Sequence, residues 1–287
     1  MDYKTEDLTK EEAGYIGEKI NEIIPREVDA DVEEFVLKVE NEDGEIIGGC
    51  IAETYEYHWS RVFLEDLWVD ERYRHHGIGS MIIREVERIA LEKGCRVITL
   101  GTTSFMARPF YEKHGYTVFT TLKKANGYID YSLVKYLDRD TSEYVPTNNS
   151  GTRYRISIGN DDDADVILKG IDTYSEAYVP KYENAGFYKK LVDKDGRFTA
   201  GVIADVHKGA YGYVEALFVE EALRHQGLGT CLLKKAEDFA KTKGALMVMT
   251  RAGDWNVVFF RKNGYLLRGE LKDVPKGHNS YELYKNI

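Results

Sequence analysis

The chain has 287 residues, of which 43% are hydrophobic and 31% charged, the balance of a globular protein with room for one large domain or two ordinary ones. Its formal net charge of −10 argues against nucleic-acid binding and is compatible with a cationic substrate such as an amine. No apolar run is long enough to span a bilayer, and the acidic stretch 1–12 is not typical of a signal peptide. We therefore expect a cytoplasmic protein without a membrane partner.

The cysteine and histidine pattern predicts no metal site. Cys50, Cys95 and Cys231 lie far apart, and no CxxC or zinc-ligand spacing occurs. The adjacent pair His75 and His76 lacks the separation of a helical metal-binding pair. We expect each cysteine to be a small buried apolar residue.

The first half of the chain predicts a mixed series of elements. Residues 8–24 are expected to form a helix, with Thr9 and Glu12 placed as a capping box. Residues 33–58 indicate two strands joined at 41–44. The following expected elements are a strand at 61–69, an amphipathic helix with apolar residues from 78 to 90, a strand at 96–102, a short helix at 108–114 and closing strands at 117–123 and 130–137.

The second half repeats the first. Residues 67–94 match residues 217–244 at an offset of 150, and residues 110–116 match 259–265 at an offset of 149. The single lost residue is expected in a loop. A repeat of this period indicates a duplicated domain rather than a solenoid, whose units are far shorter.

The boundary between the repeats is expected where turn-forming residues gather. We assign residues 1–140 to an N-terminal domain, 141–152 to a linker and 153–287 to a C-terminal domain. The second domain should begin with a strand near 153–160 and a helix at 163–179, and should then repeat the order of the first. The expected fold class is mixed α/β (α+β), with an antiparallel meander followed by a β-α-β element.

The phrase "RHHGIGS" at 74–80 returns as "RHQGLGT" at 224–230. Each copy lies between an expected strand and a helix, where free backbone N–H groups and glycines let a phosphate approach closely. No G-K-[ST] follows, and the third glycine of a Rossmann fingerprint is missing. The phrase therefore predicts a pyrophosphate site, and predicts it twice.

This phrase, together with "SFMARPFYEKHGY" at 104–116, resembles the two-part acetyl-CoA signature of the GNAT superfamily of N-acetyltransferases. The resemblance covers nearly the whole chain, once per half. It implies two consecutive GNAT domains, each a mixed, mostly antiparallel twisted sheet flanked by helices. The first half is especially similar to a bacterial subgroup that contains many proteins of unassigned substrate, so the resemblance names no acceptor.

The resemblance also implies where acetyl-CoA, the acyl-donor substrate, would bind. The two phrases would hold its pyrophosphate, the strands before them would run beside the pantetheine arm, and a backbone N–H near Val69 would polarise the thioester carbonyl. The residues implied for binding are Leu67, Trp68, Val69, Arg74, His75, His76, Gly77, Ile78, Gly79, Ser80 and Ser104 in the first half, and Leu217, Phe218, Val219, Arg224, His225, Gln226, Gly227, Leu228, Gly229 and Thr230 in the second.

Acetyl transfer to an amine needs a base for the amine and an acid for the leaving thiolate. Glu65 is the candidate base, because strand alternation groups it with apolar residues at 63, 67 and 69; a solvent-facing charge is the alternative. A bulge in the strand would reverse that phase. Glu215 is its counterpart in the second half.

Tyr111 is the candidate acid by the resemblance, and a core aromatic residue is the alternative. The second half departs from the signature, because Tyr111 becomes Phe260 and Ala107 becomes Asn256. The signature's asparagine is Ser104 in the first half and aligns with Gly253 in the second.

The sequence therefore predicts transfer of an acetyl group to a primary amine of a small molecule or peptide, with the first half the more active. Aromatic segments at 53–60 and 204–213 could contact the amine or form ordinary cross-strand pairs. Two further alternatives stay open. The chain could be an acyl-CoA-binding sensor or scaffold without turnover, or an acetyltransferase for protein lysines or N-termini.

Overall fold

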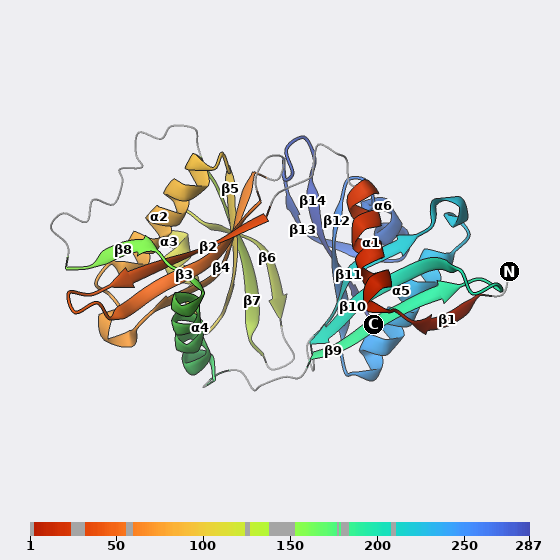
Figure 1. Cartoon of the computed structure of the whole chain (residues 1–287), viewed down its shortest axis with the longest axis horizontal. Helices are drawn as coiled ribbons and strands as arrows, with labels where there is room; N and C mark the ends of the chain where they lie inside the picture. The colour runs from red at the N-terminus through yellow and green to blue at the C-terminus, as the bar shows by residue number, and fades with distance from the viewer. Residues whose placement is uncertain are drawn as a thin grey trace. The chain divides into compact units, whose positions relative to one another are not determined.

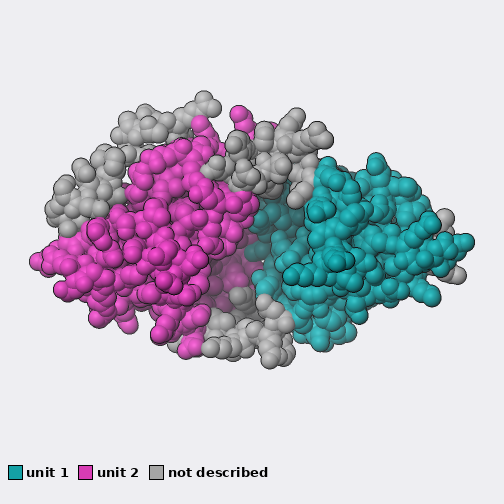
Figure 2. Space-filling view, viewed as in Figure 1, with its two compact units in different colours: residues 1–27, 182–273, 278–287 teal, residues 28–181, 274–277 magenta. Residues whose placement is uncertain are grey.

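The computed structural model describes residues 3–23, 32–55, 60–123, 127–137, 153–176, 178, 184–207 and 211–287. The chain divides into two compact units (Figure 2). Unit 1 comprises residues 1–27, 182–273 and 278–287, and unit 2 comprises residues 28–181 and 274–277.

Unit 2 contains a seven-stranded sheet with the order β6-β7-β5-β4-β3-β2-β8. Its strands are β2 (Val32–Glu40), β3 (Ile46–Tyr55), β4 (Arg61–Val69), β5 (Val97–Thr103), β6 (Thr117–Lys123), β7 (Ile129–Tyr136) and β8 (Arg155–Ile158). Neighbouring strands are antiparallel except β4 and β5, which pair in parallel. Its helices are α2 (Ile78–Glu92), α3 (Arg108–Lys113) and α4 (Asp161–Ser175), with a 3-10 turn η2 (Glu71–Tyr73) before α2.

Helices α2 and α4 cover opposite faces of this sheet. Cys50 and Ala52 of β3 join the core that α2 completes with residues such as Ile82. Ile51, whose side chain points the other way along the strand, packs with Ile167 of α4. The strand is therefore buried on both faces, which explains its nearly continuous apolar sequence.

Unit 1 repeats this arrangement with the strand order β1-β9-β10-β11-β12-β14-β13. Its strands are β1 (Lys4–Asp7), β9 (Asn184–Val192), β10 (Phe198–His207), β11 (Tyr211–Val219), β12 (Met247–Gly253), β13 (Leu266–Leu271) and β14 (Ser280–Asn286). Its helices are α1 (Lys10–Ile23), α5 (Leu228–Thr242) and α6 (Val257–Lys262), with a 3-10 turn η4 (Glu221–Leu223) before α5. Strands β11 and β12 are again a parallel pair.

The first strand and helix of each repeat lie in the unit formed mostly by the other repeat (Figure 1). Strand β1 pairs with β9, and β8 pairs with β2, both antiparallel. In unit 1, Ile16 of α1 is fully buried and lies against Gly201, where an added Cβ would come within 2.4 Å of the isoleucine. Ile167 of α4 fills the equivalent place against Gly49 in unit 2, where that distance is 2.5 Å.

The compact units do not coincide with the two sequence repeats. Unit 2 takes in residues 28–181 together with the short stretch 274–277, and the remaining residues belong to unit 1. Residues 138–152 lie outside the described residues, and the division at 141–152 stays a prediction about sequence repeats rather than folded bodies.

Most expected elements are confirmed, and so is the mixed, mostly antiparallel fold. Strand β4 has the expected bounds. The capping box at the start of α1 is present, since the Thr9 and Glu12 side chains each accept the other's backbone N–H at 3.2 and 2.9 Å. Helix α4 begins two residues earlier than expected, because Asn160 and Asp163 form a second capping box.

Candidate active site

The two parallel strands of unit 2 part halfway along their length. Strand β4 pairs with β5 from Arg61 opposite Val97 to Leu64 opposite Leu100. Both strands then continue but no longer pair with each other. Beyond that point β4 remains paired with β3, so its other edge carries backbone N–H and C=O groups that β5 does not use. Such an edge can bind a ligand that is extended like a strand.

Glu65 lies where the strands part, at a β-bulge. Asp66 pairs with Ile51 and Leu64 with Ala52, so Glu65 is the extra residue of β4. The bulge overturns the expected grouping of residue 63 with 65, 67 and 69 on one face. Leu64, Leu67 and Val69 all contact the α2 core instead, and Trp68 packs on the α4 face.

Glu65 is exposed and lies among other carboxylates, not among apolar residues. Partial burial, followed by the charges of Glu53, Asp66 and Glu34, raises its pKa above the usual value. Burial and then the charge of Asp172 raise the pKa of Asp66. A carboxylate with a raised pKa is a better proton acceptor near neutral pH, and a group of them attracts a cation.

The loop after β4 leaves backbone donors free at the start of α2. Gly77 is the N-cap with φ of 84°, and His75 also has a positive φ of 65°. The first intrahelical bond joins the Met81 N–H to the Gly77 carbonyl, so the amides of residues 78–80 precede the helix ladder. A Cβ at Gly77 would meet nothing within 4 Å, so the loop is uncovered at this position. Free amides at a helix N-terminus are a common anion site.

Gly79 has a packing role in addition to the one that was expected. A Cβ there would come within 3.1 Å of the Phe110 ring, and Gly229 has the same relation to Phe259 at 3.3 Å. Phe110 belongs to the second part of the signature. The glycine of the first part therefore makes room for the aromatic ring of the second.

Arg74 is occupied in holding the loop to its strand. Its Nε donates to the Val69 carbonyl at 3.1 Å, and its guanidinium lies 4.8 Å from the centre of the Tyr174 ring. Arg224 makes the same bond to Val219 at 3.2 Å. The backbone of the phrase, more than the arginine side chain, is thus the part presented to an anion.

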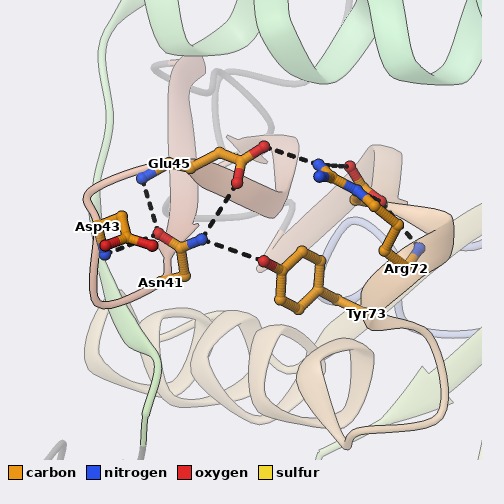
Figure 3. Close-up of polar contacts among 6 residues, drawn as sticks. Asn41, Asp43, Glu45, Arg72 and Tyr73 are labelled. Carbon is orange, nitrogen blue, oxygen red and sulfur yellow. Dashed lines mark hydrogen bonds and ion pairs between the residues drawn. The ribbon is translucent and has the colours of Figure 1, made fainter.

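The turn between β2 and β3 anchors the segment just before this loop (Figure 3). Asn41 donates to the Tyr73 hydroxyl at 3.2 Å and accepts the Glu45 N–H at 2.9 Å. Arg72 donates to Glu45 and to Asp70, both at 2.7 Å. These bonds hold Arg72 and Tyr73, the residues just before the phrase, against the β2–β3 turn.

Tyr111 of α3 is buried, with its ring against those of Phe110 and Tyr116. Burial, followed by the influence of Cys50 and Asp66, raises the pKa of its phenol far above the usual value. The hydroxyl therefore keeps its proton at neutral pH, and its burial makes it a weaker acid than a free phenol. Phe260 is also buried in unit 1 and contacts Phe259 and Tyr265, so at this position the two units differ by the hydroxyl and not by the ring packing.

Ser104 binds the start of β7. Its Oγ accepts the Ile129 N–H at 3.1 Å, and its own N–H donates to the Ile129 carbonyl. In unit 1 the corresponding acceptor is Asp254, which bonds the Asn279 N–H at 2.8 Å. The expected partner, Gly253, is instead the last residue of β12, because the loop before α6 is one residue shorter than the loop before α3.

The structure bears in part on the expectations about the aromatic segments, metal ligands, membrane spans and cysteines. Residues 56–59 and 208–210 of the aromatic segments lie outside the described residues. Within the described part of the chain, no three histidine, cysteine, aspartate or glutamate side chains gather as metal ligands, and no helix is long and apolar enough to cross a membrane. Cys50 and Cys95 are buried as expected, whereas Cys231 is exposed.

A family model described as "Acetyltransferase (GNAT) family" matches the chain twice, at residues 5–116 and 164–265. The chain belongs to the GNAT family. The matches include both phrases and strands β4 and β11. In unit 1, β11 pairs with β12 only from Gly212 to Val214, and Glu215 is the extra residue of a bulge, as Glu65 is in unit 2. The GNAT match therefore covers the site built above and its counterpart.

Named relatives match parts of this GNAT chain. A thialysine N-epsilon-acetyltransferase from Bos taurus is 34% identical over 80 residues, which are 25% of this chain and 47% of that protein. A blasticidin-S acetyltransferase from Streptomyces morookaense is 35% identical over 98 residues, or 33% of this chain and 70% of that protein. The chain thus spans about half the length of the first of these relatives.

A solved structure of an acetyltransferase from Bacillus cereus ATCC 14579 is also similar. It is 39% identical, and the match covers 46% of this chain and 96% of that one with a TM-score of 0.42.

Two residues near the candidate site, Asp66 and Tyr174, were not predicted from the sequence. For Asp66 a signal exists, because the second repeat has Ala216 in its place although it keeps Glu215. Tyr174 could not have been found by overlaying the repeats, since the exchange of segments carries α4 into the unit of the first phrase.

Proposed function

We propose that the chain is an acetyl-CoA-dependent N-acetyltransferase that acts on a primary amine of a small molecule or peptide, and that unit 2 carries the principal activity. The observation that supports this most is the meeting of three features in unit 2: an open anion-binding loop, strands that part beside it, and a protonated phenol near a group of carboxylates. The names of the relatives, which act on thialysine and blasticidin S, agree with an amine acceptor.

In the proposed reaction, the amides of residues 78–80 bind the pyrophosphate of acetyl-CoA and the free edge of β4 binds the pantetheine arm. Glu65 accepts a proton from the ammonium group, directly or through water. The amine nitrogen then attacks the thioester carbonyl, and the C–S bond breaks as the amide forms. Tyr111 donates its proton to the leaving thiolate. The second proton, which the nitrogen loses as the amide forms, restores the phenol through solvent, and Glu65 releases the first proton to solvent.

Unit 1 supports a second, narrower role. It keeps the loop, with Gly227 at φ of 82° and the Cys231 N–H bonded to the Gly227 carbonyl at 2.9 Å. It also keeps a bulged Glu215, whose pKa is raised by burial and then by Asp205. Because it lacks the phenol, we expect unit 1 to bind acyl-CoA with little turnover.

The test is an acetyl-CoA assay over a broad panel of amines, read as release of free thiol. Turnover with a small amine supports the proposal. Tight CoA binding without turnover on any amine would favour the sensor, and acetylation of protein substrates alone would favour the protein acetyltransferase. Glu65→Gln should abolish most turnover, because the amine is mostly protonated at neutral pH.

A further inference from the structure

Helix α4 belongs to the second repeat but is firmly seated in unit 2. Its capping aspartate, Asp163, accepts a hydrogen bond from Lys38 of β2 at 3.2 Å. Midway along the helix, Gly170 lies under the ring of Trp68, where an added Cβ would come within 2.3 Å of the indole. Only glycine fits so close a contact, so the sequence of α4 matches this sheet.

The last turn of α4 brings Tyr174 to the place where the strands part. The Tyr174 ring lies 4.8 Å from the guanidinium of Arg74, the residue that opens the phrase after β4. The Tyr174 hydroxyl donates to the carbonyl of Phe105, which follows β5, at 3.3 Å. One side chain therefore joins the segments that continue from the two separated strands.

The Phe105 end of this link is itself held in place. The Phe105 ring stacks on Tyr178 with centroids 4.8 Å apart and planes 10° from parallel. It also contacts Tyr128 edge-on at 4.9 Å, next to the start of β7. Tyr174 in turn contacts Tyr178 at 5.4 Å, so the link is part of an aromatic cluster and not a single contact.

We propose that Tyr174 is a positioning residue for acyl-CoA binding in unit 2, so that the second repeat completes the site built on the phrase of the first. The inference rests on the proposed function, because it assumes that the loop binds acyl-CoA. Tyr174 holds Arg74 in the orientation in which its Nε bonds the Val69 carbonyl, and thereby fixes the path of the backbone from β4 to Gly77. It also limits how far the segments after β4 and β5 move apart.

Unit 1 provides the internal comparison. Arg224 makes the equivalent bond to the Val219 carbonyl at 3.2 Å, but no aromatic ring lies against its guanidinium among the described residues of that unit. Both arginines hold their loop to the preceding strand, and Arg74 in addition contacts the Tyr174 ring. This contact distinguishes the two loops although their sequences are nearly the same.

The test is calorimetric titration of the full chain with CoA. Gly77→Glu first identifies which binding event belongs to unit 2. Tyr174→Leu should then weaken that same event about three- to tenfold, as loss of a partly desolvated cation–π contact implies. In steady state it should raise the KM for acetyl-CoA by a similar factor and leave kcat within about twofold, because Tyr174 acts through Arg74.

Two variants separate this role from general stability. Tyr174→Phe keeps the ring over Arg74 and should retain most of the affinity. Leu168→Ala changes an exposed residue of the same helix and should leave both binding events unchanged. Unaltered CoA affinity in Tyr174→Leu, equal weakening of both events, or the same loss in Leu168→Ala would overturn the inference. If the unaltered chain bound no CoA, the proposed function would fail and this inference with it.

Discussion

Units 1 and 2 share a loop and differ in what surrounds it. Both have the N-cap glycine in the left-handed region, the arginine bonded to its strand and a bulged glutamate where the strands part. At two positions near these common parts, unit 2 has a polar side chain where unit 1 has an apolar one. Tyr111 corresponds to Phe260, and Asp66 to Ala216.

The anchoring of the loop differs in the same direction. Arg72 and Tyr73, which tie the 3-10 turn of unit 2 to the β2–β3 turn, correspond to Ala222 and Leu223 in unit 1. The two loops keep the same backbone conformation, because the N-cap glycines and the helix starts that determine it are present in both units. The side chains that hold the loop, and those proposed for proton transfer, differ between the units, so nearly the same phrase lies in two different surroundings.

The sharpest test of this comparison exchanges the phenol. Tyr111→Phe should lower kcat by about 10²–10⁴-fold, the usual cost of losing a general acid, whereas Phe260→Tyr should change it little. Thiol release with any accepted amine provides the measurement. If Tyr111→Phe were nearly silent while Glu215→Gln was crippling, the active site would be in unit 1.

A second test asks whether both loops bind CoA. Gly77→Glu places a carboxylate where the pyrophosphate is expected, at a φ of 84° that also strains the new residue. We expect its site to lose about a hundredfold or more in CoA affinity from like-charge repulsion. Gly227→Glu is the matched variant. If both units bind, calorimetry should find one remaining site per chain in each variant, and unchanged affinity would remove the loop from the site.

A third test concerns the extra carboxylate of unit 2. Glu65 must be deprotonated to act as a base, so kcat/KM should fall as the pH drops through its raised pKa. Asp66→Asn removes one of the charges that raise this pKa, and Glu34 and Glu53 remain. The acid limb of the pH profile should therefore move to lower pH, by up to about one unit.

The control for this shift is Ala216→Asp, which adds the carboxylate in unit 1 and should leave the profile unchanged. A loss of activity at every pH in Asp66→Asn, with Glu65→Gln remaining active, would instead make Asp66 the base.

The smallest expected effect tests the exchange of segments. A protease site inserted within residues 138–152 and cut in the purified protein should leave CoA affinity within about twofold. The two pieces should elute together, because the ladders between β1 and β9 and between β8 and β2 join them across the cut. Fragments that separate under native conditions into independent bodies would show that each repeat folds on its own first strand and helix.

Local signals explain why so much of the fold was predictable. The helical periodicity after each phrase and the Thr9–Glu12 capping box depend on residues that are close in sequence. The repeat at an offset of 150 shows the same local signals twice. The bulge at Glu65 illustrates the limit. Strand alternation assumes one residue per step, and an extra residue reverses the phase without a mark in composition.

The family, the order of the elements and the two glycine loops before α2 and α5 could be predicted from the sequence, because glycines, caps and periodic apolar residues act over a few residues. Which first strand and helix complete which sheet became visible only in the tertiary structure, because the ladder at a sheet edge is made by main-chain groups that every strand carries. That choice brings Asp172 near Asp66 and places Tyr174 against Arg74. These contacts join residues about 100 positions apart through packing that no local pattern encodes.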